Sequence, residues 1–249
     1  MRKTLTLLSL AATLLPAVAA TTPSVPELLK AADRWRNGSD ALQVETLVAT
    51  YGRDGQLDKE RRYTVFAQPQ RRSLVLMRSS AEAGQKVLML GDDFWLLMPG
   101  SQRPMRITPS QKLLGDAAAG DIATMAWADD YEGSAGPEAP CPPPEASRRC
   151  RPLALTATRR GVTYARIDLW LGAARHEPVS ADLYVQSDKL AKRARFVLDK
   201  AGTQVDEMVL LDQLGSGKET RVRYLSRAPR AVPEAWLNPM FLARNPELD

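Results

Sequence analysis

The pattern that most constrains the fold is a long succession of short apolar segments separated by turn residues. Apolar runs of this length, alternating or continuous, are typical of strands, and the turn residues between them are typical of hairpins. Because short turns join antiparallel neighbours, we predict a mainly β protein, a meander of about 10–11 strands that closes fully or partly to protect its edges. The expected strands span residues 42–51, 61–68, 72–79, 85–90, 94–98, 163–171, 179–186, 192–200, 205–211 and 220–225.

The middle strands differ from the later ones in how their apolar residues are arranged. In residues 163–171 the apolar side chains fall on every second position, as in a half-buried strand, whereas residues 94–98 are wholly apolar. A strand that is apolar on both faces needs a cover on each side, and the polar crossing and Ala-rich segment that follow are the natural candidates. We therefore expect a lid over the mouth or interior of the barrel, formed by Ile107, Leu113, Leu114, Ile122 and Met125.

The first twenty residues have the organisation of a secretory signal peptide. Arg2 and Lys3 precede an apolar run, and small residues at 17–20 offer a cleavage site. The apolar run is shorter than the roughly 20 residues that span a bilayer, which disfavours a membrane anchor. We expect a periplasmic protein with residues 1–20 removed and residues 21–249 forming a single domain. A capping box, Ser24 to Glu27, predicts a helix at the start of that domain.

The two cysteines lie close together in a proline-rich stretch. Residues 133–151 are rich in proline, glycine and alanine, and are expected to form a long loop. An even number of cysteines in an exported chain favours a disulfide, here between Cys141 and Cys150. A metal site is disfavoured because no histidine or third cysteine accompanies the pair.

The sequence contains no signature of catalysis or of nucleic-acid binding. It has no nucleophile elbow, phosphate-binding loop, dinucleotide fingerprint or cluster of metal ligands, so we expect neither an enzyme nor a bound cofactor. Acidic pairs at 92–93 and 129–130 flank strands, where aspartate commonly forms turns. Arginine pairs such as 71–72 and 159–160 are interpreted as solvated strand faces, with contact to anionic lipid as the alternative. No basic motif interleaved with aromatic residues argues for nucleic-acid binding.

Residues 91–127 resemble a known family. The strand "DFWLLMP", followed by "RPMRITPSQKLLG" and "GDIA", is similar to the LolA-like superfamily of periplasmic carriers, and within it to the outer membrane lipoprotein-sorting proteins. The resemblance implies an incomplete antiparallel β-barrel with helices that cover or plug it. It also implies an inner-membrane exporter as donor and an outer-membrane acceptor. One departure is the run Ala117–Ala119, where the family often has bulkier residues, so the lid contacts are expected to be looser.

A carrier of lipid or lipidated protein needs a wide apolar cavity more than it needs reactive groups. Each methylene that leaves a bilayer must regain about 0.8 kcal/mol from protein contacts. Strand alternation suggests which side chains would contact the acyl chains, although a shift of one residue in register would reverse their faces. The candidate wall residues are Leu74, Leu76, Val87, Met89, Phe94, Leu96, Ile167, Leu169, Leu183 and Phe196.

Two other functions are compatible with the same fold. The LolA-like fold also occurs in periplasmic regulators that bind an anti-sigma factor. Such regulators carry a further C-terminal domain, and this chain is expected to end after one. An envelope hydrolase is the third possibility, disfavoured by the missing pair of nucleophile and base.

Overall fold

The computed structural model describes residues 23–37, 41–107, 126–159 and 162–244. Helix α1 (Val25–Asn37) begins where the capping box predicts. The backbone N–H of Ser24 donates to the Glu27 carboxylate over 2.8 Å, and its hydroxyl donates to the same oxygen over 2.7 Å. Among the described residues, none of the helices has the length and apolar character needed to cross a bilayer.

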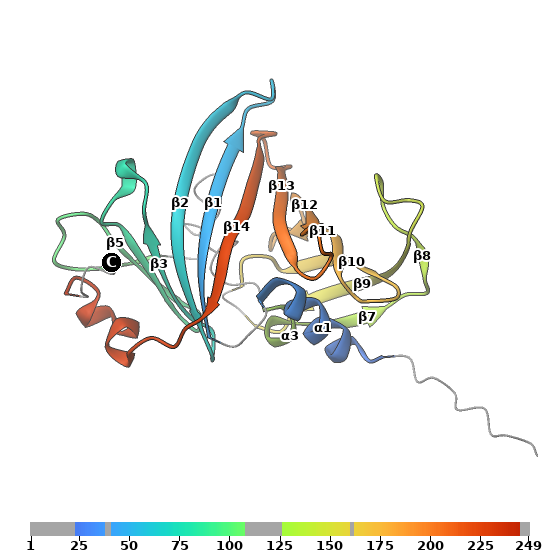
Figure 1. Cartoon of the computed structure of the whole chain (residues 1–249). Helices are drawn as coiled ribbons and strands as arrows, with labels where there is room; N and C mark the ends of the chain where they lie inside the picture. Colours follow the sequence, from blue (N-terminus) through green and yellow to red (C-terminus); the bar gives the residue numbers. More distant parts are fainter. Residues whose placement is uncertain (1–22, 38–40, 108–125, 160–161, 245–249) are drawn as a thin grey trace, which may run out of the picture.

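The described residues form fourteen strands, all in one antiparallel sheet (Figure 1). The order is β6-β5-β4-β3-β2-β1-β14-β13-β12-β11-β10-β9-β7, with β8 beside β9, and the sheet remains open between β6 and β7. This confirms the predicted incomplete barrel. The strands are β1 (Leu42–Tyr51), β2 (Leu57–Gln68), β3 (Arg72–Met77), β4 (Lys86–Leu90), β5 (Asp93–Leu97), β6 (Met105–Ile107), β7 (Tyr131–Ala135), β8 (Ala139–Pro140), β9 (Arg149–Ala157), β10 (Arg166–Gly172), β11 (Pro178–Tyr184), β12 (Leu190–Leu198), β13 (Val205–Asp212) and β14 (Glu219–Pro229).

Four strands lie beyond the predicted ten. Strand β9 was missed although Leu153 and Leu155 are buried in alternation, whereas the other three lack an apolar pattern strong enough to mark them. Strand β6 has three residues, β8 has two, and β7 is exposed along most of its length. The segment 133–151, expected as a loop, contains the end of β7, all of β8 and the start of β9. Its prolines are tolerated because this is the edge of the sheet, where a strand needs fewer backbone donors. Within this segment, residues 141–148 form the turn between β8 and β9. A 2.9 Å hydrogen bond from Cys141 N–H to the Arg148 carbonyl closes it.

The predicted disulfide joins Cys141 and Cys150 at the base of this turn, with Cα atoms 4.9 Å apart. Both cysteines are buried and pack with Val179 and, in part, Trp170. The cross-link therefore fixes the β8–β9 turn against strands β10 and β11. The prediction of this disulfide from the even cysteine count is confirmed.

The sheet has two halves, which we call the N-terminal wing (β1–β6) and the C-terminal wing (β7–β14). In Figure 1, β1, β2 and β14 stand upright where the wings join, whereas β9 and β10 run across the view. Helix α1 packs on one face of the C-terminal wing, which we call the inner face. There Leu28, Leu29 and Ala32 are fully buried in a cluster that extends over β9–β14. A second short helix, α3 (Trp127–Asp130), adds the buried Trp127 to the same cluster.

The N-terminal wing is covered on its outer face by the end of the chain. The 3-10 helices Glu234–Leu237 and Pro239–Phe241 follow β14, and another, Ser80–Glu82, precedes β4. Leu237 and Leu242 pack in one cluster with Leu88 and Leu97. The C-terminal tail therefore covers the outer face of the wholly apolar strand β5.

Candidate functional site

The register of the sheet shows which predicted wall residues share a face. Val65, Val75, Val87 and Leu96 are successive cross-strand partners from β2 to β5. Directly paired residues in an antiparallel sheet project to the same side, and so do alternate residues of one strand. Val87, Met89, Phe94 and Leu96 therefore form one apolar cluster, which also includes Val65 and Val75.

Strand β1 shows that this cluster lies on the inner face. Val44 and Val48 each lie two residues from Thr46 along the strand, so all three project to the same side. Val44 pairs with Val65 of the N-terminal cluster, and Val48 belongs to the cluster under α1. The inner face thus continues from one wing to the other through the buried Thr46, whose cross-strand partners are Tyr63 and Tyr224.

The four predicted wall residues of the C-terminal wing also lie on the inner face. Ile167, Leu169, Leu183 and Phe196 are all buried in the cluster that contains α1 and Trp127. Phe196 meets Trp127 edge to face, with ring centroids 5.6 Å apart. In this conformation the wall of the C-terminal wing is thus already covered by the two helices.

Leu74 and Leu76 are the exceptions, because they project to the outer face. Both belong to the cluster covered by the C-terminal tail, with Leu88 and Leu97. Strand β3 is apolar from Leu74 to Met77, so its sequence contains no alternation from which the inner side could be chosen. The inner residue of this strand is Val75, which pairs with Val65 and Val87. The alternation of Tyr63, Val65 and Ala67 in β2 was the available signal.

The predicted lid residues fall mostly outside the described part of the chain. Leu113, Leu114, Ile122 and Met125 lie outside the described residues. Ile107 is the last residue of β6 and pairs with Phe94, where it packs against the inner cluster of the N-terminal wing. Ile107 is thus part of the sheet itself and extends the apolar inner face by one strand.

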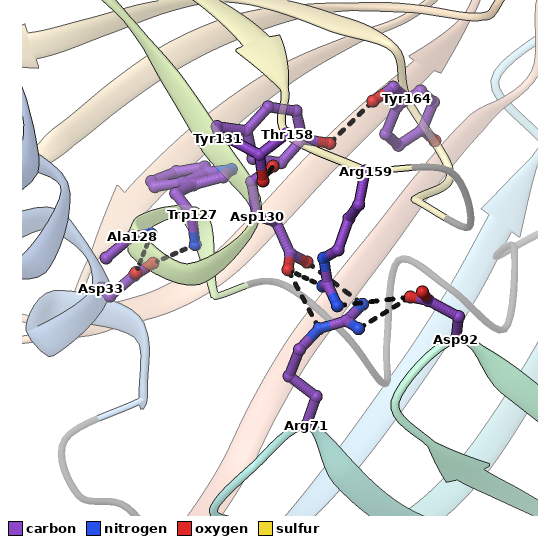
Figure 2. A network of polar contacts seen from close by, with 10 residues as sticks. All are labelled: Asp33, Arg71, Asp92, Trp127, Ala128, Asp130, Tyr131, Thr158, Arg159 and Tyr164. Atoms are coloured by element: carbon purple, nitrogen blue, oxygen red, sulfur yellow. Dashed lines mark hydrogen bonds and ion pairs between the residues drawn. The ribbon is translucent and has the colours of Figure 1, made fainter.

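Four charged side chains form a network between the two wings (Figure 2). Arg71 lies in the β2–β3 turn and Asp92 in the β4–β5 turn, whereas Asp130 ends α3 and Arg159 follows β9. Asp130 accepts from Arg71 Nε over 2.9 Å and from an Nη of Arg159. Asp92 accepts from Arg71 Nη1 over 2.8 Å and lies 3.3 Å from Arg159 Nη1. Each acid therefore contacts both arginines, and the network contains equal numbers of positive and negative charges.

The network continues to α1 through the short helix α3. The Asp33 carboxylate accepts from the backbone N–H of Trp127 over 3.0 Å and of Ala128 over 2.9 Å, which satisfies the first donors of α3. At the other end of α3, the Asp130 carbonyl accepts from Thr158 N–H over 2.9 Å. Helix α3 is thus attached both to α1 and to the end of β9 (Figure 2).

Burial raises the pKa of Asp130 in the network and of Asp33, which binds the first turn of α3. The Asp130 side chain is 5% exposed, and burial raises its pKa above the ordinary value, against the lowering effect of Arg71 and Arg159. Burial likewise raises the pKa of Asp33, opposed by Arg36 and the two α3 amides. Among the residues that the structure describes, no three acidic, histidine or cysteine side chains converge in a group that could hold a metal ion.

Comparison with solved structures identifies the fold. A LolA superfamily protein from Nitrosomonas europaea superposes with a TM-score of 0.76 at 28% identity, over 87% of this chain and 98% of that one. The chain belongs to the LolA-like superfamily. A DUF1329 family protein from Desulfovibrio piger has the same fold, with a TM-score of 0.69 at 19% identity over 86% and 95% of the two chains.

An outer membrane lipoprotein-sorting protein domain from Vibrio parahaemolyticus is a further LolA-like neighbour, with a TM-score of 0.69 at 15% identity over 88% and 98%. A family model described as "Uncharacterized protein" matches residues 69–244, so this LolA-like chain is a member of that family as well. The curated proteins contain no match to it.

Proposed function

We propose that this LolA-like protein is a periplasmic carrier that binds acyl chains of lipid or lipidated protein on its inner face. The observation that carries the proposal is the apolar inner surface of an open sheet, which extends over both wings. A surface of this kind can replace bilayer contacts without any chemical step, since each buried methylene contributes about 0.8 kcal/mol. The structural neighbour from Vibrio parahaemolyticus, named as an outer membrane lipoprotein-sorting protein domain, is consistent with the same role.

The proposal includes export and a direction of transport. Residues 1–20 would direct the chain to the periplasm, where an oxidising environment suits the Cys141–Cys150 disulfide. An inner-membrane exporter would supply the cargo and an outer-membrane acceptor would receive it. An intact mass that places the N-terminus near Thr21 would support this route, and a retained leader in periplasmic protein would contradict it.

A pair of adjacent residues in β4 allows a matched test of acyl binding. Met89 projects to the inner face and Leu88 to the outer face, and both are buried. Met89→Gln and Leu88→Gln each place one amide in apolar surroundings, so their costs to folding should be similar. Only Met89→Gln should weaken binding of a fluorescent fatty acid, by about tenfold if the lost contact contributes ~1.4 kcal/mol.

Three measurements make this test decisive. Urea unfolding measures the stability of each variant, a titration with the fluorescent fatty acid measures affinity, and mass spectrometry identifies lipid that co-purifies with the wild type. Equal loss of affinity in both variants would contradict binding at the inner face. A folded wild type that takes up no acyl probe, lipid or lipopeptide would refute the carrier function altogether.

A further inference from the structure

Four neutral side chains in the described part of the chain have a buried polar atom without a hydrogen-bond partner. Three of them, Thr46, Ser73 and Trp127, are at most 1% exposed and lie on the inner face. Ser73 pairs with the inner residue Met89, and Trp127 belongs to the cluster under α1. Buried hydroxyl and indole N–H groups are nearly always paired, because an unpaired one loses its bonds to water without compensation. The inner face therefore holds donors that a bound molecule could pair.

Thr46 differs from the other two in its place between the two inner apolar clusters. Along β1 it lies between Val44, which packs against the cluster of the N-terminal wing, and Val48, which belongs to the cluster of the C-terminal wing. Across the sheet its partners are Tyr63 on β2 and Tyr224 on β14. The two clusters share no buried residue. The inner face therefore changes from apolar to polar at Thr46 and becomes apolar again beyond it.

A shift in strand register sets the surroundings of Thr46. The β1–β14 pairing changes register between Glu45 and Thr46, so Tyr224 faces Thr46 where an unshifted ladder would place Leu225. Bulges of this kind re-aim side chains and are frequent beside functional sites. Here the result is a tyrosine on each side of Thr46, and Tyr63 packs against both clusters. Aromatic rings that suit acyl chains thus flank a hydroxyl that needs an acceptor.

We propose that the Thr46 hydroxyl binds an ester carbonyl of the cargo, at the point where the acyl chains join their polar linkage; we call this position the carbonyl seat. The inference rests on the proposed function, because it adds a polar subsite to the same acyl-binding face. An ester carbonyl accepts a hydrogen bond and carries no charge, so it can pair a buried hydroxyl without the cost of burying an ion. The chains that begin at the carbonyl would meet apolar surface on both sides of Thr46.

The carbonyl seat predicts a selectivity that apolar surface alone would not create. A diacyl lipid and a dialkyl ether lipid with equal chains bury nearly the same methylenes, but only the diacyl lipid has carbonyls. A site built around a hydrogen bond discriminates against a ligand that lacks the matching group, because the buried donor is then left unpaired. We therefore expect ester-linked lipid to bind about tenfold more tightly than ether-linked lipid, the ratio that corresponds to ~1.4 kcal/mol.

A competition within one vesicle measures this selectivity directly. The protein is incubated with vesicles that contain equal amounts of diester and diether phosphatidylglycerol with the same chains, and native mass spectrometry of the re-isolated protein counts each bound lipid. Thr46→Val removes the hydroxyl and keeps the shape of the side chain, whereas Thr46→Ser retains the hydroxyl. Thr64→Val is the matched control, because Thr64 is also 1% exposed but pairs with Leu76 on the outer face and donates to Glu45 over 3.0 Å.

A second arm distinguishes lipid from lipidated protein as the source of the ester. Diacylglyceryl-cysteine and dialkylglyceryl-cysteine peptides, again with equal chains, replace the two phospholipids in the vesicles. Ester selectivity with the peptides alone would support the carbonyl seat and assign it to lipidated protein. Ester selectivity with the phospholipids alone would support it and assign it to lipid.

In the selective arm, we expect a diester-to-diether ratio of about ten for the wild type, Thr46→Ser and Thr64→Val, and a ratio of about one for Thr46→Val. Thr46→Val should melt no lower than the wild type, because it removes an unpaired buried hydroxyl. Bound lipid without ester selectivity in either arm, or selectivity that Thr46→Val retains, would overturn the carbonyl seat and leave the carrier function intact. A folded wild type that binds none of the four probes would refute the carrier function, and the carbonyl seat with it.

Discussion

The C-terminal tail should contribute strongly to stability because it covers the outer face of the N-terminal wing. Leu242 is fully buried there with Leu97 and Leu237, and its carbonyl accepts from Lys86 Nζ over 3.2 Å. A buried Leu→Ala change typically costs about 2–5 kcal/mol, depending on how far the site can collapse. A site near the end of the chain can relax readily, so we expect Leu242→Ala to lower the free energy of unfolding by ~2–3 kcal/mol.

Met240 provides the control two residues earlier. Its side chain is 81% exposed, so Met240→Ala should change the free energy of unfolding by less than about 0.5 kcal/mol. Urea unfolding followed by tryptophan fluorescence measures both variants, since Trp236 packs edge to face on Phe66 in the same region. Acyl binding should be unchanged in both, because the tail lies on the outer face. A difference of less than about 1 kcal/mol between the variants would refute the covering role of the tail.

Three further predictions concern the disulfide, the α3 cap and the buried acid. Replacing both Cys141 and Cys150 by serine should lower the free energy of unfolding by about 2–3 kcal/mol, measured by thermal melting of the two proteins. Asp33→Ala should cost ~1–2 kcal/mol in the same melts, whereas Asp33→Asn, which can still cap α3, should cost less. Because burial raises the folded-state pKa of Asp130, the folded chain takes up a proton before the unfolded chain does as pH falls from 7. The wild type should therefore gain stability relative to Asp130→Asn between the folded pKa and the unfolded value of about 3.9, and a parallel pH dependence of the two proteins would contradict this.

Alternation in the sequence was sufficient to assign faces where a strand is half polar. In β10, the charged Arg166 and Asp168 mark the outer side, so Ile167 and Leu169 could be assigned to the inner face from the sequence alone. In β3 every central position is buried, because the C-terminal tail covers the side that would otherwise be polar. A cover that comes from a distant part of the chain removes the local signal, and this is why Leu74 and Leu76 were assigned to the wrong face.

The charged network between the wings could not have been found from local patterns. The acidic pairs at 92–93 and 129–130 were interpreted as turn formers, and the arginine pairs at 71–72 and 159–160 as solvated faces. One member of each pair is instead in the network, yet Arg71 and Asp130 are 59 residues apart. Their contact depends on the curvature of the whole sheet, which is the sum of many strand twists and is not set by any one segment.

On the proposed function, the cost of moving α1 sets the kind of cargo that could use the inner face of the C-terminal wing. Displacing the helix would expose Leu28 and Leu29, which are almost fully buried, at roughly 2 kcal/mol each. An acyl chain recovers about 0.8 kcal/mol per methylene, so five or six contacting methylenes roughly offset the two leucines. Chains much longer than this could fill the wall that α1 leaves, whereas short-chain acids could not. Affinity that rises with chain length only beyond roughly this point would support displacement of α1, and a uniform increase from the first methylene would place the binding on the N-terminal wing alone.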